Sequence, residues 1–177
     1  MKNLPNQSRR DFIKKTSLIG SSLAAFPFVT QAGHVNTSVD DSIKIALIGC
    51  GGRGTGAAMQ ALSTKQNVKL VAMADAFRDR LDSCYKELND PNNEDGNVSQ
   101  RVAVPEENKF VGFDGYKKAM ALADVVILTT PPGFRPIHFE EAVNQGKQIF
   151  MEKPVATDPA GIKRVLDAAV IARQKKL

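Results

Sequence analysis

The segment Ile43–Gly56 (IKIALIGCGGRGTG) constrains the fold of this chain more than any other. An apolar run rich in β-branched residues leads directly into a G-x-G-x-x-G pattern. Glycines at this spacing, between a strand and a helix, let the backbone approach a pyrophosphate closely and offer it the N–H groups of a helix N-terminus. The segment therefore predicts a dinucleotide-binding loop, formed by Gly49, Gly51, Gly52, Arg53 and Gly54.

An acidic residue supports this interpretation, because a G-x-G-x-x-G pattern alone is weak evidence. Asp75 follows Gly54 by 21 positions, at the predicted carboxyl end of the next strand. A carboxylate there can accept hydrogen bonds from the adenosine ribose and would repel a 2′-phosphate, which favours NAD. Arg78 and Arg80 follow closely and leave NADP as an alternative. The non-functional alternative is that Asp75 is a solvated strand-end carboxylate that caps the following helix.

From Ile43 onward, apolar segments typical of strands alternate with segments typical of helices. Strands that are apolar on both faces and linked by helices indicate a parallel sheet covered on both sides. We therefore expect an α/β fold, a Rossmann doubly wound parallel sheet with helices on both faces. Residues 90–107, rich in Pro, Asn and Asp, are predicted to form a surface loop. The predicted strands are 43–49, 68–74, 109–113, 125–130 and 148–151, and the predicted helices are 54–63, 78–89, 116–122, 136–145 and 159–175.

The charge of the chain is concentrated at its N-terminus. The formal net charge is +5, but residues 1–32 carry five basic and one acidic side chain, so the remainder is nearly neutral. A nucleic-acid partner is therefore not expected. The two cysteines, Cys50 and Cys84, are expected to be free thiols, and no metal site is predicted.

The first 32 residues resemble a bacterial twin-arginine export signal. Ser8–Lys14 (SRRDFIK) precedes a short apolar stretch, Ser17–Val29, and small residues around Ala32 suit a signal peptidase. We expect residues 1–32 to be a signal peptide read by the twin-arginine translocase, residues 33–42 a linker, and residues 43–177 the folded domain. The protein is then expected in the periplasm or otherwise exported. The alternative is a basic N-terminus with a chance Arg-Arg pair.

Further candidate residues follow the fourth and fifth predicted strands. Thr130 and Pro131 would face the middle of a bound cofactor, although two consecutive prolines also stop a strand without any further role. His138 is a candidate site residue on the helix that follows. Glu152-Lys153-Pro154 ends the fifth strand, and a proline there often follows a cis peptide bond. Lys153 is predicted to point into the cleft and to stabilise a developing alkoxide, and Glu152 to bind the nicotinamide ribose or to orient Lys153. An exposed ion pair before a turn is the alternative.

From about Ile43 to Leu177, the chain resembles the Gfo/Idh/MocA family, the glucose–fructose oxidoreductase and inositol dehydrogenase group. The resemblance lies in IGCGGRG, Asp75, VVILTTPP, His138 and MEKPVATDPAGIKRVL. It implies a Rossmann domain that binds NAD or NADP through the glycine loop, Asp75, Thr130, Pro131, Glu152, Lys153 and Pro154. It also implies a nicotinamide near Lys153 and sugar or polyol substrates, with Lys153 and His138 as the catalytic candidates.

Family members continue into a second α/β domain that forms the substrate site and the usual homo-oligomer interface. This sequence is expected to lack that domain and to have little turnover alone. Two other functions stay open. One is oxidation followed by elimination, which cleaves glycosidic bonds without net redox change. The other is a nucleotide-binding module without catalysis.

Overall fold

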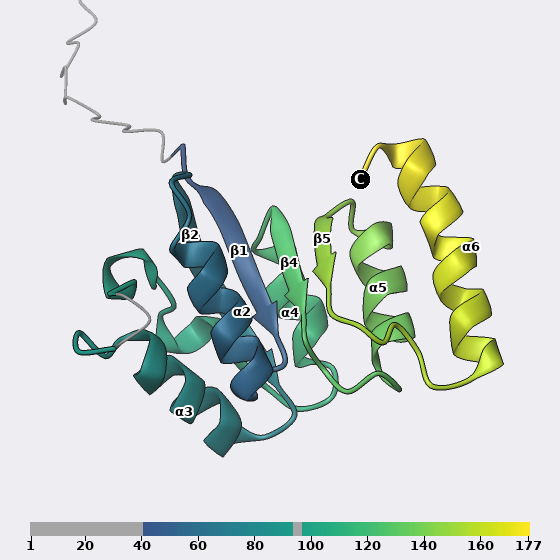
Figure 1. Ribbon diagram of the computed structural model, residues 1–177. Coiled ribbons are helices and arrows are strands. Elements are labelled where there is room, and N and C mark those ends of the chain that lie inside the picture. Colours follow the sequence, from purple (N-terminus) through teal and green to yellow (C-terminus); the bar gives the residue numbers. More distant parts are fainter. Residues whose placement is uncertain (1–40, 94–96) are drawn as a thin grey trace, which may run out of the picture. The chain divides into compact units, whose positions relative to one another are not determined.

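Five parallel strands form one sheet in the order β3-β2-β1-β4-β5 (Figure 1). The computed structural model describes residues 41–93 and 97–177. The predicted signal peptide at residues 1–32 lies outside the described residues, as does nearly all of the predicted linker at 33–42. The strands are β1 (Ile43–Ile48), β2 (Val68–Asp75), β3 (Lys109–Val111), β4 (Val125–Leu128) and β5 (Gln148–Met151).

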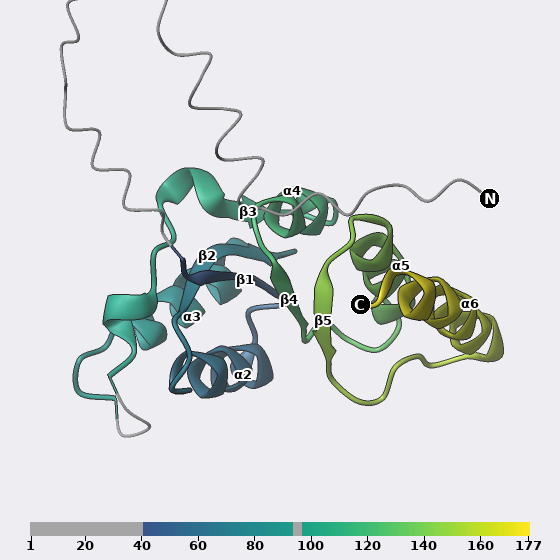
Figure 2. The ribbon, with the colours of Figure 1, turned by 90° about the horizontal axis from the view of Figure 1, so that it is seen from above.

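Helices cover both faces of the sheet, which confirms the predicted Rossmann-type α/β fold. Seen from above, α2 and α3 lie on one side of the strands, and α4 and α5 lie on the other (Figure 2). The last helix packs against α5 and lies at the end of the sheet beyond β5. The helices are α2 (Gly52–Leu62), α3 (Arg78–Leu88), α4 (Gly115–Ala121), α5 (Arg135–Asn144) and α6 (Pro159–Lys175).

The central strand β1 supplies side chains to two separate hydrophobic cores. Successive residues of a strand point to opposite faces, so Ile45 and Leu47 pack on the α2 and α3 side, whereas Ala46 and Ile48 pack on the α4 side. All four side chains are buried. This two-sided burial explains why the sequence of β1 is a continuous apolar run and not an alternating one.

The segment predicted as a surface loop is partly buried, so that prediction is wrong for its second half. Two short 3-10 helices occupy Ser99–Arg101 and Glu106–Asn108. Between and before them, Val98 and Val104 enter the core, and Val102 forms a parallel bridge with Leu70 of β2. Three valines spaced through a polar segment are the local signal of this burial.

The β5 and α6 side of the domain exposes apolar side chains. Phe150 of β5 is 48% exposed, and Leu166 and Val170 of α6 are 61% and 56% exposed. The α6 helix starts as predicted, because the Asp158 side chain accepts a hydrogen bond from the Gly161 N–H at 2.8 Å. In the part of the chain that is described, no helix combines the length and apolarity needed to span a membrane.

Candidate functional site

The glycines of the loop between β1 and α2 fulfil two different requirements. Gly49 has a φ of +97°, and a Cβ there would lie 2.7 Å from the Thr130 nitrogen. A Cβ on Gly54 would lie 2.0 Å from the Gly49 carbonyl oxygen, so these two positions need glycine for packing. A Cβ on Gly51 or Gly52 would meet nothing within 4 Å. The open side of the loop is therefore a cradle that an approaching phosphate could enter.

The helix that follows the loop begins two residues earlier than predicted, at Gly52. Gly51 is its N-cap and makes no side-chain cap, so the first N–H groups of α2 have no side-chain partner there. Arg53 thus lies in the first helical turn. The positive end of the helix dipole and the Arg53 guanidinium both favour an anion at this place.

Asp75 is held by the glycine loop itself. Its Oδ2 accepts a hydrogen bond from the Cys50 N–H at 2.7 Å, and its Oδ1 accepts one from the Phe77 N–H at 2.9 Å. Each carboxylate oxygen retains a further acceptor site for a ribose hydroxyl. Asp75 does not cap α3, because Phe77 is the N-cap residue of that helix and no side chain caps it.

The two arginines near Asp75 differ in their surroundings. Arg78 donates to the Asp82 carboxylate at 2.9 Å and to Glu106 at 2.6 Å, which raises the pKa of its guanidinium. It is therefore engaged by acidic partners. Arg80 instead lines the pocket beside Asp75.

A pocket of about 500 Å³ lies at the carboxyl ends of the strands, next to Gly49, Gly51 and Asp75. Its walls are mostly apolar and include several aromatic rings, of which Phe113 and Phe134 have their centroids 6.0 Å apart. Its aromatic residues were not predicted from the sequence. What these aromatic residues share is their place in the sequence, shortly after the ends of β2, β3 and β4. They are Phe77, Phe113, Tyr116 and Phe134.

His138 lies in the wall of this pocket and is buried. Its Nδ1 is 3.0 Å from the Thr130 Oγ1, and its ring centroid lies 4.2 Å from that of Tyr116. Burial lowers the pKa of His138 to about 4, so the imidazole is neutral at neutral pH. Thr130 and Pro131 line the same pocket, whereas Lys153 is not among the residues that line it. The catalytic role of His138 stays a prediction.

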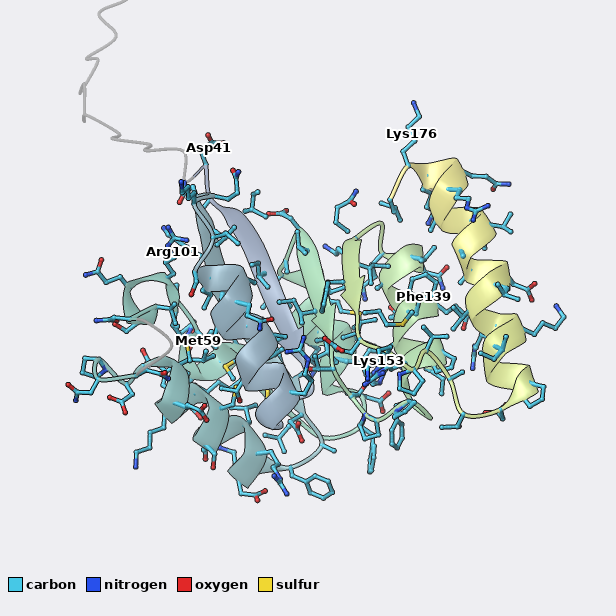
Figure 3. The ribbon with its side chains drawn as sticks, in the orientation of Figure 1. Asp41, Met59, Arg101, Phe139, Lys153 and Lys176 are labelled. Atoms are coloured by element: carbon cyan, nitrogen blue, oxygen red, sulfur yellow. The ribbon has the colours of Figure 1, made fainter. Side chains whose placement is uncertain are left out.

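The Glu152-Lys153-Pro154 segment meets the glycine loop through an ion pair. The Arg53 Nε donates to the Glu152 Oε1 at 2.8 Å, and the Arg53 Nη2 contacts the same oxygen. This contact lowers the pKa of Glu152. The Lys153–Pro154 peptide bond is cis, as predicted. Lys153 is exposed on the connection from β5 to α6 (Figure 3).

Arg135 is a further residue near the site that was not predicted from the sequence, whereas Thr129 belongs to the predicted Thr-Thr-Pro-Pro strand end. Arg135, at the first position of α5, is buried and donates to the carbonyl oxygens of Thr130, Glu152 and Pro154. The Thr129 hydroxyl donates to the Gly49 carbonyl at 2.7 Å. A positively charged residue inside an apolar helix start was the available signal for Arg135.

The thiols of Cys50 and Cys84 are both buried and free, as expected. A hydrogen bond between the two thiols, together with burial, raises the pKa of Cys50. Within residues 41–93 and 97–177, no cluster of three or more His, Cys, Asp or Glu side chains could hold a metal ion.

A parallel sheet in this order, with a glycine turn after β1 and an acidic residue after β2, defines a Rossmann dinucleotide-binding domain. The chain belongs to the Gfo/Idh/MocA family, described as an oxidoreductase family with an NAD-binding Rossmann fold, whose model matches residues 43–176. No curated protein sequence matches the chain significantly.

Solved structures of inositol dehydrogenases have the same fold. Apo scyllo-inositol dehydrogenase from Lactobacillus casei is 27% identical, with a TM-score of 0.54 over 76% of this chain and 34% of that one. The same enzyme with NAD(H) and scyllo-inositol is 24% identical, with a TM-score of 0.54 over 76% of this chain and 34% of that one. Myo-inositol 2-dehydrogenase from Lactobacillus plantarum is 23% identical, with a TM-score of 0.54 over 73% and 33%. The chain thus spans about a third of the length of these structures.

Proposed function

We propose that residues 43–177 are the cofactor-binding part of an oxidoreductase that transfers hydride between the hydroxyl-bearing carbon of a sugar or polyol and NAD. The observation that carries this proposal is the Asp75 carboxylate, which is fixed beside the glycine loop by the Cys50 N–H at 2.7 Å. The aromatic pocket next to it has the size and apolar walls that suit an adenine ring.

NAD is the favoured cofactor because of the charges around the ribose position. A 2′-phosphate would lie against the Asp75 carboxylate, and Arg78 is already engaged by Asp82 and Glu106. Arg80 in the pocket wall is the residue through which NADP could still be accommodated. A related solved structure of lower identity, the 3-ketoreductase KijD10 from Actinomadura kijaniata, holds NADP.

The residues near the cis-proline turn suit the reacting end of the cofactor. The nicotinamide ring, when bound, supplies the carbon that accepts or donates hydride. The Lys153 ammonium would donate a hydrogen bond to the substrate hydroxyl oxygen and stabilise the negative charge on it as the hydroxyl proton leaves to solvent and the C–H electron pair passes with the hydride to the cofactor. Glu152 binds the ribose next to the nicotinamide. The neutral His138 contacts the Thr130 hydroxyl and so orients the part of the pocket wall that faces the cofactor.

Calorimetric titration with NAD tests the proposal through Asp75→Ala. Loss of the ribose hydrogen bonds is expected to weaken NAD binding roughly tenfold, or about 1.4 kcal/mol. Asp167→Asn is the control, because Asp167 is ionically paired with Lys163 on the exposed surface of α6. NAD affinity that is the same in wild type and in Asp75→Ala would refute the ribose contact.

We also propose that turnover requires a substrate-binding part that residues 43–177 do not supply. The exposed apolar side chains of β5 and α6 and the greater length of the related structures support this. Residues 43–177 alone are expected to bind NAD but to oxidise inositols and hexoses at no more than background rate, as followed by NADH absorbance. Sugar oxidation at enzyme-like rates by purified residues 43–177 would refute this part.

Export rests on the sequence of residues 1–32, and we propose the twin-arginine translocase as the partner. The route carries folded proteins with cofactors in place, which agrees with a nucleotide-binding domain. A fusion of residues 1–42 to a reporter protein should reach the periplasm, and Arg9→Lys combined with Arg10→Lys should keep it in the cytoplasm. Equal export of both fusions would contradict the proposal.

A further inference from the structure

Arg135 is a buried cation whose partners are backbone carbonyl groups. It is 5% exposed, and its Nε donates to the Thr130 carbonyl oxygen at 2.7 Å. Its Nη1 donates to the carbonyl oxygens of Glu152 and Pro154, at 2.7 and 2.6 Å. Burial lowers the pKa of the guanidinium, and the negative charge of Glu152 opposes this shift. Three backbone carbonyl oxygens thus take the place of water as hydrogen-bond acceptors of the buried guanidinium.

This arrangement ties together two segments that are far apart in the sequence. The Thr130 carbonyl belongs to the turn after β4, and the other two carbonyls belong to the segment after β5. The carbonyls of Glu152 and Pro154 lie on either side of Lys153 in the chain. The bonds of one guanidinium therefore restrain the backbone before and after Lys153 and link it to the wall of the pocket.

Burial of a charge is unfavourable unless hydrogen bonds compensate for the lost hydration. An apolar residue could fill the interior of this turn without that cost, but it could not hold three carbonyl oxygens in fixed directions. The fork of the guanidinium, with several N–H groups in one plane, can do so. Arg135 thus contributes fixed hydrogen-bond directions to the three carbonyl oxygens, which an apolar residue could not provide.

We propose that Arg135 is the positioning residue of Lys153: it fixes the backbone on both sides of Lys153 so that the ammonium is held at the nicotinamide end of the cofactor. The proposal rests on the function proposed above for Lys153. Two of the three bonds of Arg135 go to the Glu152-Lys153-Pro154 segment, and the third goes to Thr130 in the pocket wall. Arg135 therefore acts mainly on the nicotinamide half of the site. Its loss should therefore weaken mainly the part of the binding free energy that the nicotinamide half contributes, including the ribose contact proposed for Glu152.

The test compares NADH with ADP, which lacks the nicotinamide half, by calorimetry on wild type and Arg135→Lys. We expect Arg135→Lys to weaken NADH about tenfold and to leave ADP affinity within twofold. The matched control is Arg101→Lys, because the Arg101 Nη1 also donates to two backbone carbonyls, Leu62 and Thr64, both at 2.7 Å and away from the site. This control should leave both affinities within twofold of wild type.

The outcomes separate the two proposals. Equal weakening of NADH and ADP by Arg135→Lys, or no weakening of either, overturns the positioning role alone. Wild type that binds neither ligand overturns the proposed function together with this inference.

A second measurement needs no variant and covers the case in which Arg135→Lys does not fold. In 15N-labelled wild type, the Nε–H of Arg135 should give a signal that exchanges slowly with solvent. NADH should shift this signal more than ADP does, because only NADH reaches the Lys153 part of the segment that Arg135 holds. A signal that responds equally to both ligands, or to neither, contradicts the inference.

Discussion

Arg53 and Glu152, 99 residues apart in the sequence, form an ion pair that joins the first turn of α2 to the segment carrying Lys153. The Glu152 carboxylate is largely covered, with 12% of its side chain exposed, whereas Arg53 is half exposed. The carboxylate thus engages the side chain of a residue in the first turn of α2, the turn at which an anionic phosphate is also favoured. A bound pyrophosphate and Glu152 would compete for the same guanidinium.

This competition predicts that Glu152→Gln increases nucleotide affinity, although the substitution removes a residue near the site. Removal of the negative charge frees Arg53 for the phosphates, so ADP affinity should rise about threefold to tenfold in calorimetric titrations at low salt. The control is Glu140→Gln, since Glu140 is paired with Arg164 at 2.7 Å between α5 and α6. ADP affinity that falls or stays constant in Glu152→Gln would show that Arg53 does not exchange partners.

Two glycines of the loop should separate folding from binding. Gly54→Ala places a Cβ 2.0 Å from the Gly49 carbonyl oxygen and should lower the free energy of unfolding by roughly 3 kcal/mol. Gly51→Ala meets no atom within 4 Å, so it should leave stability nearly unchanged but weaken ADP and NAD by obstructing the phosphate cradle. Urea unfolding and calorimetry on both variants provide the measurements. Full nucleotide affinity in Gly51→Ala would argue against a phosphate at this loop.

His138 should make the stability of the domain depend on pH. Its pKa is about 4 in the folded chain, below the ordinary value of 6.5, so the unfolded chain binds the proton more readily. The stabilisation is complete above pH 6.5 and is lost as the pH falls from 6.5 towards 4. At pH 5 the loss amounts to about 2 kcal/mol.

Urea unfolding at pH 7 and pH 5 of wild type and His138→Gln isolates this contribution. The difference between wild type and the variant should shrink or reverse at pH 5, because glutamine does not titrate. A difference that is equal at both pH values would mean that the folded chain does not exclude the proton from His138.

Local sequence patterns were sufficient to predict most of the fold. The apolar runs of β1 and β4 marked strands buried on both faces, and the Asp158-Pro159 pair marked the start of α6. The insertion after α3 was predicted less well. Val98 and Val104 are separated by polar residues, so no local periodicity marks them as buried. Their burial results from tertiary packing into the hydrophobic core beside β2.

The sequence by itself determined the Rossmann topology, the glycine loop, Asp75 and the cis-proline turn at Lys153, because each depends on glycine, proline or hydrophobic patterns within a few residues. Only the tertiary structure decided that Arg53 pairs with Glu152 and that Arg135 holds the carbonyls around Lys153. These contacts join segments that meet at one edge of the sheet after long separations in the chain. Ion pairs and hydrogen bonds between such distant segments produce no repeating pattern in the sequence. They form only when the parallel strands bring their carboxyl ends together.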